Sequence, residues 1–148
     1  MRCFFTFLVA TLILSACKTY SKEDKIGFDN TIKKYIAKNN ITIQKTSSGL
    51  YKKCLTKGDG QIVHFTDSVS VTYSGELING GIFDNHTKPQ TLPVRGLIAG
   101  WKEALVGSRI GDKWLLIIPP QLGYGQNKLD DIPMNSILVF EIKIEDVK

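Results

Sequence analysis

Two segments of the chain, residues 68–74 and 138–145, carry apolar side chains at every second position and mostly polar side chains between them. This period of two is typical of a β-strand with one buried and one polar face. A third segment, residues 114–118, is apolar throughout and ends at Pro119-Pro120. That pattern predicts a central strand buried on both faces. The chain is therefore expected to form a sheet of short strands with few helices.

The segment before these strands has the pattern of an amphipathic helix. Ser21 and Asp24 have the spacing of a capping box, in which two side chains bond the free backbone amides at a helix start. Apolar residues then recur every three or four positions, at Phe28, Ile32, Tyr35 and Ile36. We expect a helix over residues 22–38. Its apolar stripe is narrow, so two alternatives stay open: the helix packs on the domain, or it is a stalk.

One further short helix is predicted between Gly96 and Gly107. Four apolar residues of this segment fall on one helical face, namely Ile98, Trp101, Ala104 and Leu105. Glycine is common just after the end of a helix, which makes Gly107 a natural stop. A helix at this place would press Trp101 into the concave side of the sheet.

The size and charge of the chain indicate one folded domain and no nucleic-acid partner. Its 148 residues are 43% hydrophobic and 22% charged, which is ordinary for a domain with a single core. The formal net charge is +5, but 16 of the 19 cationic side chains are lysines, scattered along the sequence. Nucleic-acid recognition normally uses clustered basic residues, arginines prominent among them.

The first 16 residues have the composition of a secretory signal peptide. Arg2 precedes an apolar run over residues 4–14, and the small residues Ser15 and Ala16 follow. The run is much shorter than the ~20 apolar residues that a membrane-spanning helix needs. We therefore expect residues 1–16 to be a signal peptide that is cleaved off, and not a membrane-spanning helix.

Residues 14–17, Leu-Ser-Ala-Cys, resemble the lipobox of bacterial lipoproteins. This resemblance implies cleavage before Cys17 and a lipid on its sulfur. Residues 17–46 would then be a lipidated tether with the helix, residues 47–148 the folded domain, and the protein would be anchored in the cell envelope, with the leaflet left open. The alternative is an ordinary signal peptide that contains a cysteine. Cys54 would remain as the single thiol, and we expect it to be buried on a strand.

The sequence carries no spacing typical of a metal or cofactor site. His64 and His86 are 22 positions apart and are expected to be solvated loop residues. Asp130-Asp131 is interpreted as part of a turn. Gly58-Asp59-Gly60 and Gly80-Gly81 are interpreted as hairpin turns, because no phosphate-binding motif surrounds them. We expect neither a metal nor a cofactor.

A set of aromatic residues from separate predicted elements forms the remaining candidate site. Its members, which Asp84 accompanies, are Tyr73, Phe83, Trp101, Tyr124 and Phe140. Aromatic side chains dominate ordinary cores, so composition alone favours a core at this place.

Eight short blocks of the sequence bear on that choice, with VTYSG, GIFDN and GWKEAL among them. They resemble, in order, the signatures of the FKBP-type peptidyl-prolyl cis/trans isomerases, and the resemblance covers about residues 48–147. A match at one block arises easily by chance, whereas eight in order do not. The blocks are residues 71–75, 81–85, 100–105, 111–113, 117–120, 122–125, 132–133 and 138–142.

The resemblance implies an α+β fold in which an antiparallel sheet curls around a short helix, with an apolar active-site cleft between them. It assigns the cleft as follows: Trp101 as the floor, Tyr73, Phe83 and Phe140 as walls, Asp84 and Tyr124 at the polar rim, and Leu97, Ile98 and Ile132 as contacts to the peptide. The implied partners are proline-containing polypeptides, turned over by a monomeric domain. Our hypothesis gives the substrate carbonyl oxygens to Tyr124 and the Ile132 amide, and the polarisation of the imide to Asp84.

Two other functions stay open. Gln90 stands where many FKBP-type proteins carry another pocket aromatic, and Asp131 stands where an apolar residue is common. These departures allow a proline-peptide-binding module with little turnover. The second alternative is a structural lipoprotein that keeps only the scaffold, because a fold does not fix a function.

Overall fold

The computed structural model describes residues 20–148, so the predicted signal peptide and Cys17 lie outside the described residues. Neither helix within residues 20–148 is long and apolar enough to cross a membrane. The elements follow in the order α1 (Lys22–Lys38), β1 (Gln44–Lys45), β2 (Tyr51–Thr56), β3 (Ser68–Leu77), β4 (Ile82–Pro93), a 3-10 turn (Val94–Gly96), α2 (Ala99–Leu105), β5 (Lys113–Ile118), a second 3-10 turn (Pro120–Leu122) and β6 (Leu138–Val147).

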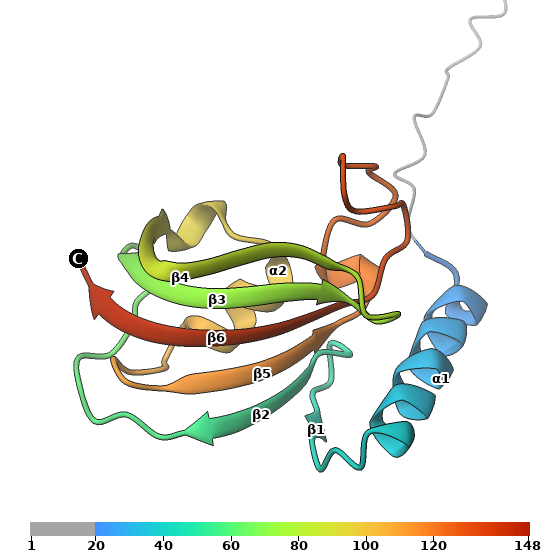
Figure 1. Ribbon diagram of the computed structural model, residues 1–148, viewed down its shortest axis with the longest axis horizontal. Helices are drawn as coiled ribbons and strands as arrows, with labels where there is room; N and C mark the ends of the chain where they lie inside the picture. Colours follow the sequence, from blue (N-terminus) through green and yellow to red (C-terminus); the bar gives the residue numbers. More distant parts are fainter. Residues whose placement is uncertain (1–19) are drawn as a thin grey trace, which may run out of the picture.

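The six strands form one antiparallel sheet in the order β1-β2-β5-β6-β3-β4 (Figure 1). The predicted strands at residues 68–74, 114–118 and 138–145 are confirmed, and the α+β class with them. Gly80-Gly81 forms the tight turn between β3 and β4, as predicted. Gly80 has a φ of 97°, a conformation that glycine adopts at little cost.

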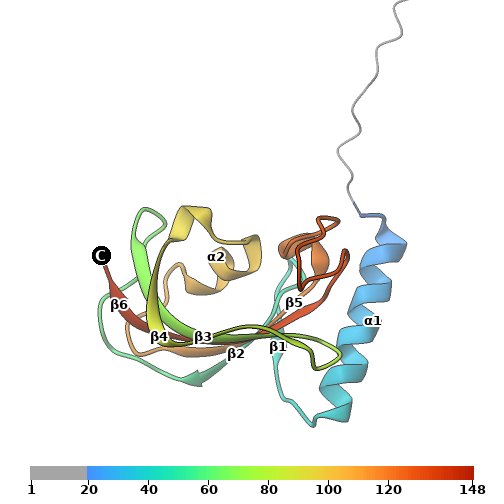
Figure 2. The same ribbon diagram turned by 45° about the horizontal axis from the view of Figure 1, so that its top comes forward.

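The sheet is curved, and α2 lies on its concave side (Figure 2). Gly100 allows the close approach, because a Cβ atom at that position would lie only 2.8 Å from Cγ2 of Ile118. The prediction of a short helix that presses Trp101 onto the sheet is confirmed. The apolar side chains that meet there form the main core: Val69, Val71, Trp101, Ala104, Leu105, Leu116, Ile118, Leu138, Ile142 and Ile144.

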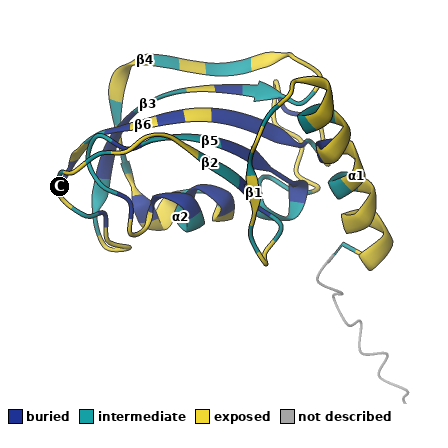
Figure 3. Cartoon of the chain, turned by 90° about the horizontal axis from the view of Figure 1, so that it is seen from below, coloured by how far each residue is buried: buried dark blue, intermediate teal, exposed yellow. Residues whose placement is uncertain are grey.

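Helix α1 covers the other face of the sheet, at the end where β5 stops and β6 starts (Figure 3). The capping box is present, with Ser21 and Asp24 each bonding the backbone amide of the other. Ile32, only 1% exposed, packs into a second cluster with Tyr51, Ile117, Ile137 and Val139. Of the two alternatives for this helix, the structure therefore has the packed one.

Burial increases along β5. Its last residues, Leu116 to Ile118, are buried on both faces, as the apolar run predicts. Trp114 and Leu115 are only half-buried. Leu115 lies at the border of the cluster under α1, whereas Trp114 lies on the opposite face, at the border of the main core. The prediction of a strand buried on both faces is thus correct for half of β5.

Asp29 fastens α1 to the sheet through polar contacts. Its carboxylate accepts hydrogen bonds from the Tyr51 hydroxyl at 2.6 Å and from Lys45, and pairs with Lys33 at 2.8 Å. Burial by itself raises the pKa of Asp29, but the hydrogen bonds from these three partners outweigh it and hold the pKa well below its usual range. The ionised form of Asp29 therefore stabilises the folded protein.

Asp29→Asn is expected to lower the free energy of unfolding by about 1–2 kcal/mol at pH 7, the range for hydrogen bonds to a charged group near the surface. Because the folded pKa is depressed, this stabilisation is complete above the unfolded pKa of about 3.9 and is lost as the pH falls through the folded value. Urea unfolding at several pH values should show the two proteins converging as the solution becomes acidic. A gap that stays constant, or a similar loss in the control Asp130→Asn, would contradict this account.

Two predictions for the first half of the domain are wrong. Gly58-Asp59-Gly60 is not a hairpin turn but part of a connection that runs against the loop before β5, where the Gly58 amide donates to Oδ1 of Asp112 at 2.7 Å. Cys54 lies on β2 as expected, yet it is exposed. It is exposed because β1 pairs only with Tyr51 and Lys52 and leaves the rest of the β2 edge uncovered.

Candidate active site

A cleft of about 260 Å³ lies between the concave face of the sheet and the segment that enters α2. Trp101 and Phe140 are 4% and 3% exposed, whereas Tyr73, Phe83 and Tyr124 are only half-buried, so the cleft has a closed floor and an open rim. It brings together all six residues predicted to be catalytic, and two of the three predicted contacts. Its lining is Tyr73, Phe83, Asp84, Leu92, Gly96, Leu97, Ile98, Trp101, Tyr124 and Phe140.

The apolar part of the cleft is a continuous set of aromatic rings. The Trp101 ring meets Tyr73 and Phe140 edge-on, with centroid distances of 5.0 and 5.1 Å and interplanar angles of 86° for both. Phe83 meets Phe140 in the same way at 5.5 Å. Edge-to-face pairs of this kind contribute about 0.5–1.5 kcal/mol each beyond their buried area. The rings therefore hold one another in place and present a fixed apolar surface.

Gly75 makes this ring arrangement possible. It lies on β3 between Phe140 on β6 and Asp84 on β4 in the strand register. A Cβ atom at Gly75 would lie 2.6 Å from Cε1 of Phe140 and 2.8 Å from the Phe83 ring. Because Gly75 has no side chain, the Phe83 and Phe140 rings can occupy the space above it and contact each other.

The polar rim is built around the Asp84 carboxylate. The Tyr73 hydroxyl donates to its Oδ2 at 2.7 Å, and its Oδ1 lies 2.9 Å from Nε2 of His86. The His86 ring also packs on Tyr73, with a centroid distance of 5.0 Å. His86 was expected in a solvated loop, and that prediction is wrong: it lies on β4, half-buried, as a partner of Asp84.

The two phenols of the cleft keep their protons at neutral pH. Burial raises the pKa of Tyr73 far above its ordinary value, and the hydrogen bond to Asp84 and the charge of Asp84 raise it further. Burial, followed by the charge of Asp84, also raises the pKa of Tyr124. Both residues are therefore hydrogen-bond donors over the physiological range. The Tyr73 hydroxyl donates its hydrogen bond to Asp84. Among the described residues of the cleft, Tyr124 is therefore the phenol that can donate a hydrogen bond to a ligand.

Two backbone amides were candidates for contact with the peptide. Ile98 is the N-cap residue of α2, lines the cleft, and its amide donates no backbone hydrogen bond within residues 20–148. Ile132 is buried in the core outside the lining, and its amide points to the Leu129 carbonyl at 3.4 Å. That contact closes the turn around Asp130-Asp131, which confirms the turn prediction. The free amide at the cleft is thus the one of Ile98.

Leu92 and Gly96 line the cleft and were missed from the sequence, as was His86 at the rim. Gln90 and Asp131, the two departures from the family pattern, are both outside the lining; the Gln90 amide bonds the Lys88 carbonyl instead. Within the described part of the chain, no three His, Cys, Asp or Glu side chains are grouped so that they could hold a metal ion. What the site offers chemically is an apolar surface and, at its rim, the Tyr124 hydroxyl and the Ile98 amide as donors and the Asp84 carboxylate.

Comparison with known proteins agrees with this geometry. Residues 60–145 match the model of the family described as FKBP-type peptidyl-prolyl cis-trans isomerase. A curated relative, FKBP-type peptidyl-prolyl cis-trans isomerase FkpA of Buchnera aphidicola subsp. Schizaphis graminum, is 35% identical over 153 residues, which cover 95% of this chain and 61% of the relative. The chain spans about half the length of the other curated relatives it matches, including the Mip isomerase of Coxiella burnetii.

Solved structures give the same result. The crystal structure of FkpA from Escherichia coli superimposes with a TM-score of 0.74 at 35% identity, and the match covers 85% of this chain and 62% of that one. A peptidyl-prolyl cis-trans isomerase of Pseudomonas syringae pv. tomato gives a TM-score of 0.72 at 31% identity, with 88% of this chain and 98% of that one covered. Fold, cleft and matched residues thus agree, and the chain belongs to the FKBP-type peptidyl-prolyl cis-trans isomerase family.

Proposed function

We propose that this protein catalyses the cis/trans isomerisation of Xaa-Pro bonds in polypeptides. The observation that carries the proposal is the open cleft with a buried Trp101 floor, aromatic walls and free donors at its rim. The cleft has the size and surface for one apolar ring, and proline is the residue whose ring carries the peptide nitrogen. Membership in the FKBP-type family supports the same activity.

The reaction needs no covalent chemistry. Resonance gives the peptide C–N bond partial double-bond character and a rotation barrier of ~18–20 kcal/mol. An isomerase lowers this barrier if it binds the twisted amide more tightly than either planar form. In the twisted state the resonance is lost, the carbonyl is less polar, and the nitrogen lone pair becomes an acceptor.

The aromatic walls act on the resonance itself. Water stabilises the charge-separated form of the planar amide, so moving the bond from water onto Phe83, Trp101 and Phe140 disfavours that form relative to the twisted one. Trp101 and Phe140 are buried and held edge-on by their neighbours, so the surface does not have to reorganise when the substrate binds. This preorganisation favours the twisted amide without a moving part.

The polar rim positions the substrate. In our proposal the Tyr124 hydroxyl and the Ile98 amide donate to carbonyl oxygens on either side of the proline, and Ile98 takes the role first considered for Ile132. The Asp84 carboxylate, held by Tyr73 and His86, faces the same cleft as a fixed negative charge. Its negative charge polarises the twisted imide, whose carbonyl carbon loses the electron donation from nitrogen during rotation.

Asp84→Asn is expected to lower kcat/KM for a proline-containing tetrapeptide about tenfold, equivalent to ~1.4 kcal/mol, because the shape is kept and the charge is removed. The rate can be measured with a protease-coupled assay on an Ala-Leu-Pro-Phe peptide. Asp131→Asn is the matched control, since Asp131 is exposed and outside the cleft. Equal rates in wild type and Asp84→Asn would contradict the role given to this carboxylate.

The activity itself is tested by exchange NMR on the same peptide, which reports binding and turnover separately. Acceleration of the cis/trans exchange by the wild-type protein at catalytic concentration is the expected result. Binding of the peptide without faster exchange would show that the protein is a proline-peptide-binding module and not an enzyme. If the peptide neither binds nor exchanges faster, the protein has kept only the fold of the family and not its activity.

We further propose that the protein is a monomeric lipoprotein of the cell envelope, anchored by a lipid on Cys17, and that its clients are exported polypeptides. The support is the sequence alone: a basic residue, an apolar run and the Leu-Ser-Ala-Cys box at residues 14–17. Mass spectrometry of the mature N-terminus should find a diacylglyceryl group on Cys17, and fractionation should find the protein in the membrane. An unmodified N-terminus at another residue, or a soluble fraction only, would overturn this part.

A further inference from the structure

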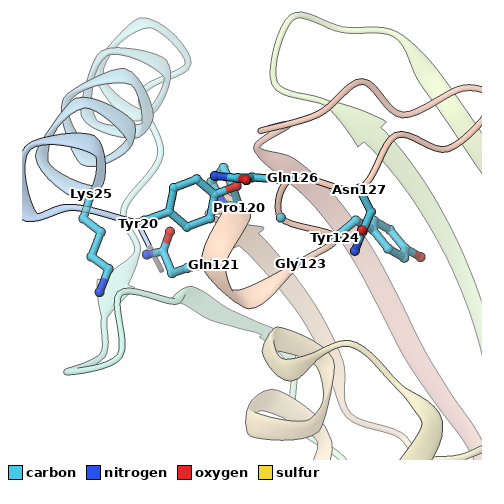
Figure 4. A pocket seen from close by; sticks show the side chains of 9 residues that line it. Tyr20, Lys25, Pro120, Gln121, Gly123, Tyr124, Gln126 and Asn127 are labelled. Atoms are coloured by element: carbon cyan, nitrogen blue, oxygen red, sulfur yellow. The ribbon is translucent and has the colours of Figure 1, made fainter. Parts of the chain in front are cut away.

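A second and larger cavity, of about 430 Å³, lies between the start of α1 and the loop that follows β5 (Figure 4). Tyr124 lines both this cavity and the aromatic cleft, so the two adjoin at that residue. In Figure 4 the Tyr124 ring points away from Tyr20, while the chain on either side of Tyr124 borders the cavity. Residues that line it are Tyr20, Lys25, Pro120, Gln121, Gly123, Tyr124, Gly125, Gln126 and Asn127.

The wall on the α1 side is held in place. The Tyr20 hydroxyl donates to Oδ1 of Asn135 at 2.7 Å, and the Tyr20 ring meets Phe28 edge-on with a centroid distance of 5.2 Å. Tyr20 and Lys25 precede the region, residues 60–145, that matches the family model. The cavity therefore depends on the N-terminal segment of this chain as well as on the isomerase domain.

The lining is rich in neutral amide groups, one of which has an unmet bond. Oε1 of Gln121 is buried and accepts no hydrogen bond within residues 20–148. A buried acceptor without a donor is costly, so a rotation of the Gln121 side chain that brings this oxygen to the N–H group of a ligand would be favourable. Gln126 and Asn127 are exposed and offer both donors and acceptors. Apart from Lys25, the lining is uncharged, and its paired donors and acceptors suit a peptide backbone, which carries one N–H and one C=O per residue.

The aromatic cleft is too small to hold more than a short part of a polypeptide, so the residues next to a bound proline must lie outside it. At 260 Å³ the cleft is below the ~300–1,000 Å³ typical of pockets that enclose a drug-sized ligand, whereas the second cavity falls within that range. An extended chain advances about 3.3–3.6 Å per residue, so the neighbours of a bound proline leave the cleft across its rim. Tyr124 is the rim residue that the two cavities share.

We propose that this cavity is a second substrate subsite, which binds the backbone of client residues that flank the proline. The proposal rests on the isomerase function proposed above and deepens it. Gln121 and Gln126 bond the backbone of the client, so binding there depends on the length of the client and not on its sequence. Long unfolded polypeptides are then better substrates than short peptides.

The test compares the Ala-Leu-Pro-Phe tetrapeptide with a 12-residue peptide that has the same four residues at its centre and neutral residues on both sides. For wild type, kcat/KM should be at least about tenfold higher for the long peptide. In the Gln121→Leu variant, the ratio of kcat/KM for the long peptide to kcat/KM for the tetrapeptide should fall towards one. This variant should fold, because leucine has a similar size and removes the unpaired oxygen. Gln44→Leu, an exposed amide on β1, is the matched control and should keep the wild-type ratio.

Binding at the subsite can also be seen without turnover. The side-chain amide NMR signals of Gln126 and Asn127 should shift when the long peptide is added, and not with the tetrapeptide. If wild type accelerates both peptides equally, or Gln121→Leu keeps the full ratio, the subsite proposal is overturned while the isomerase function stands. If neither peptide is accelerated, the isomerase function fails first.

Discussion

Trp101→Leu is expected to lower kcat/KM for a proline-containing tetrapeptide by tenfold or more, the largest loss of activity for any single change at the cleft. In the proposed mechanism the indole is the floor on which the proline ring rests, and it contacts Tyr73 and Phe140 edge-on at 5.0 and 5.1 Å. Leucine is too small to reach both rings, so they would lose their common support. A tenfold loss corresponds to ~1.4 kcal/mol of transition-state binding.

Trp101→Phe separates the role of the ring from the role of size. The indole Nε1 donates no hydrogen bond within residues 20–148, so phenylalanine gives up no polar contact and keeps an aromatic face. We expect activity within a few-fold of wild type. The leucine variant should also lose about 2–4 kcal/mol of stability through the cavity it leaves, so circular dichroism must confirm that it is folded in the assay. A leucine variant as active as the phenylalanine variant would remove the aromatic floor from the mechanism.

Gly58→Ala is expected to destabilise the protein by about 3 kcal/mol, at the upper end of the cost of inserting a methyl group into a packed region. A Cβ atom at Gly58 would lie 2.2 Å from the Ile110 carbonyl oxygen and 2.5 Å from the Asp112 amide. Both neighbours are backbone atoms and cannot turn aside as a side chain can. The segments would have to separate, which also breaks the Gly58 bond to the buried Asp112 carboxylate.

Gly27→Ala is the matched control for this prediction. A Cβ atom at Gly27 has nothing within 4 Å, and the position lies inside α1, where alanine is favoured over glycine by about 0.5–1 kcal/mol. Urea unfolding should therefore move the two variants in opposite directions from wild type. A Gly58→Ala variant of wild-type stability would show that the loop before β5 yields more easily than its contacts suggest.

The sequence predicted the elements well where side-chain periodicity carried the information. The capping box at Ser21 and the alternation in β3 and β6 are local patterns, and the structure confirms the cap and both strands, although Ser70 on the polar face of β3 is buried. The packing of α1 was not predictable, since a narrow stripe such as the one around Ile32 is compatible with either burial or a stalk. Gly58 was misread because a glycine pair signals a tight turn or a close backbone approach, and the sequence does not distinguish the two.

At the site, the family blocks indicated that the aromatic set lines a cleft. The contacts of the β4 side chains depend on the register of that strand, which the blocks do not give. Between Val71 and Tyr73 the pairing with β4 shifts, from Gln90 to His86, and this irregularity places His86 opposite Tyr73. Gln90 is outside the cleft, while Leu92 further along the strand lines it. A bulge leaves no periodic signal in one sequence, so the position of His86 opposite Tyr73 could not be assigned beforehand.

The place of β6 in the sheet has a consequence for how the molecule assembles. β6 is the last strand of this sequence, yet it is the one that joins β5 to β3. A chain emerging from a ribosome or a translocation channel with its N-terminus first cannot complete its hydrogen-bond ladder before residue 138 has appeared. Such long-range pairing slows folding, because the loop entropy is lost before the contacts form. The sheet of the nascent protein is therefore incomplete until β6 has emerged.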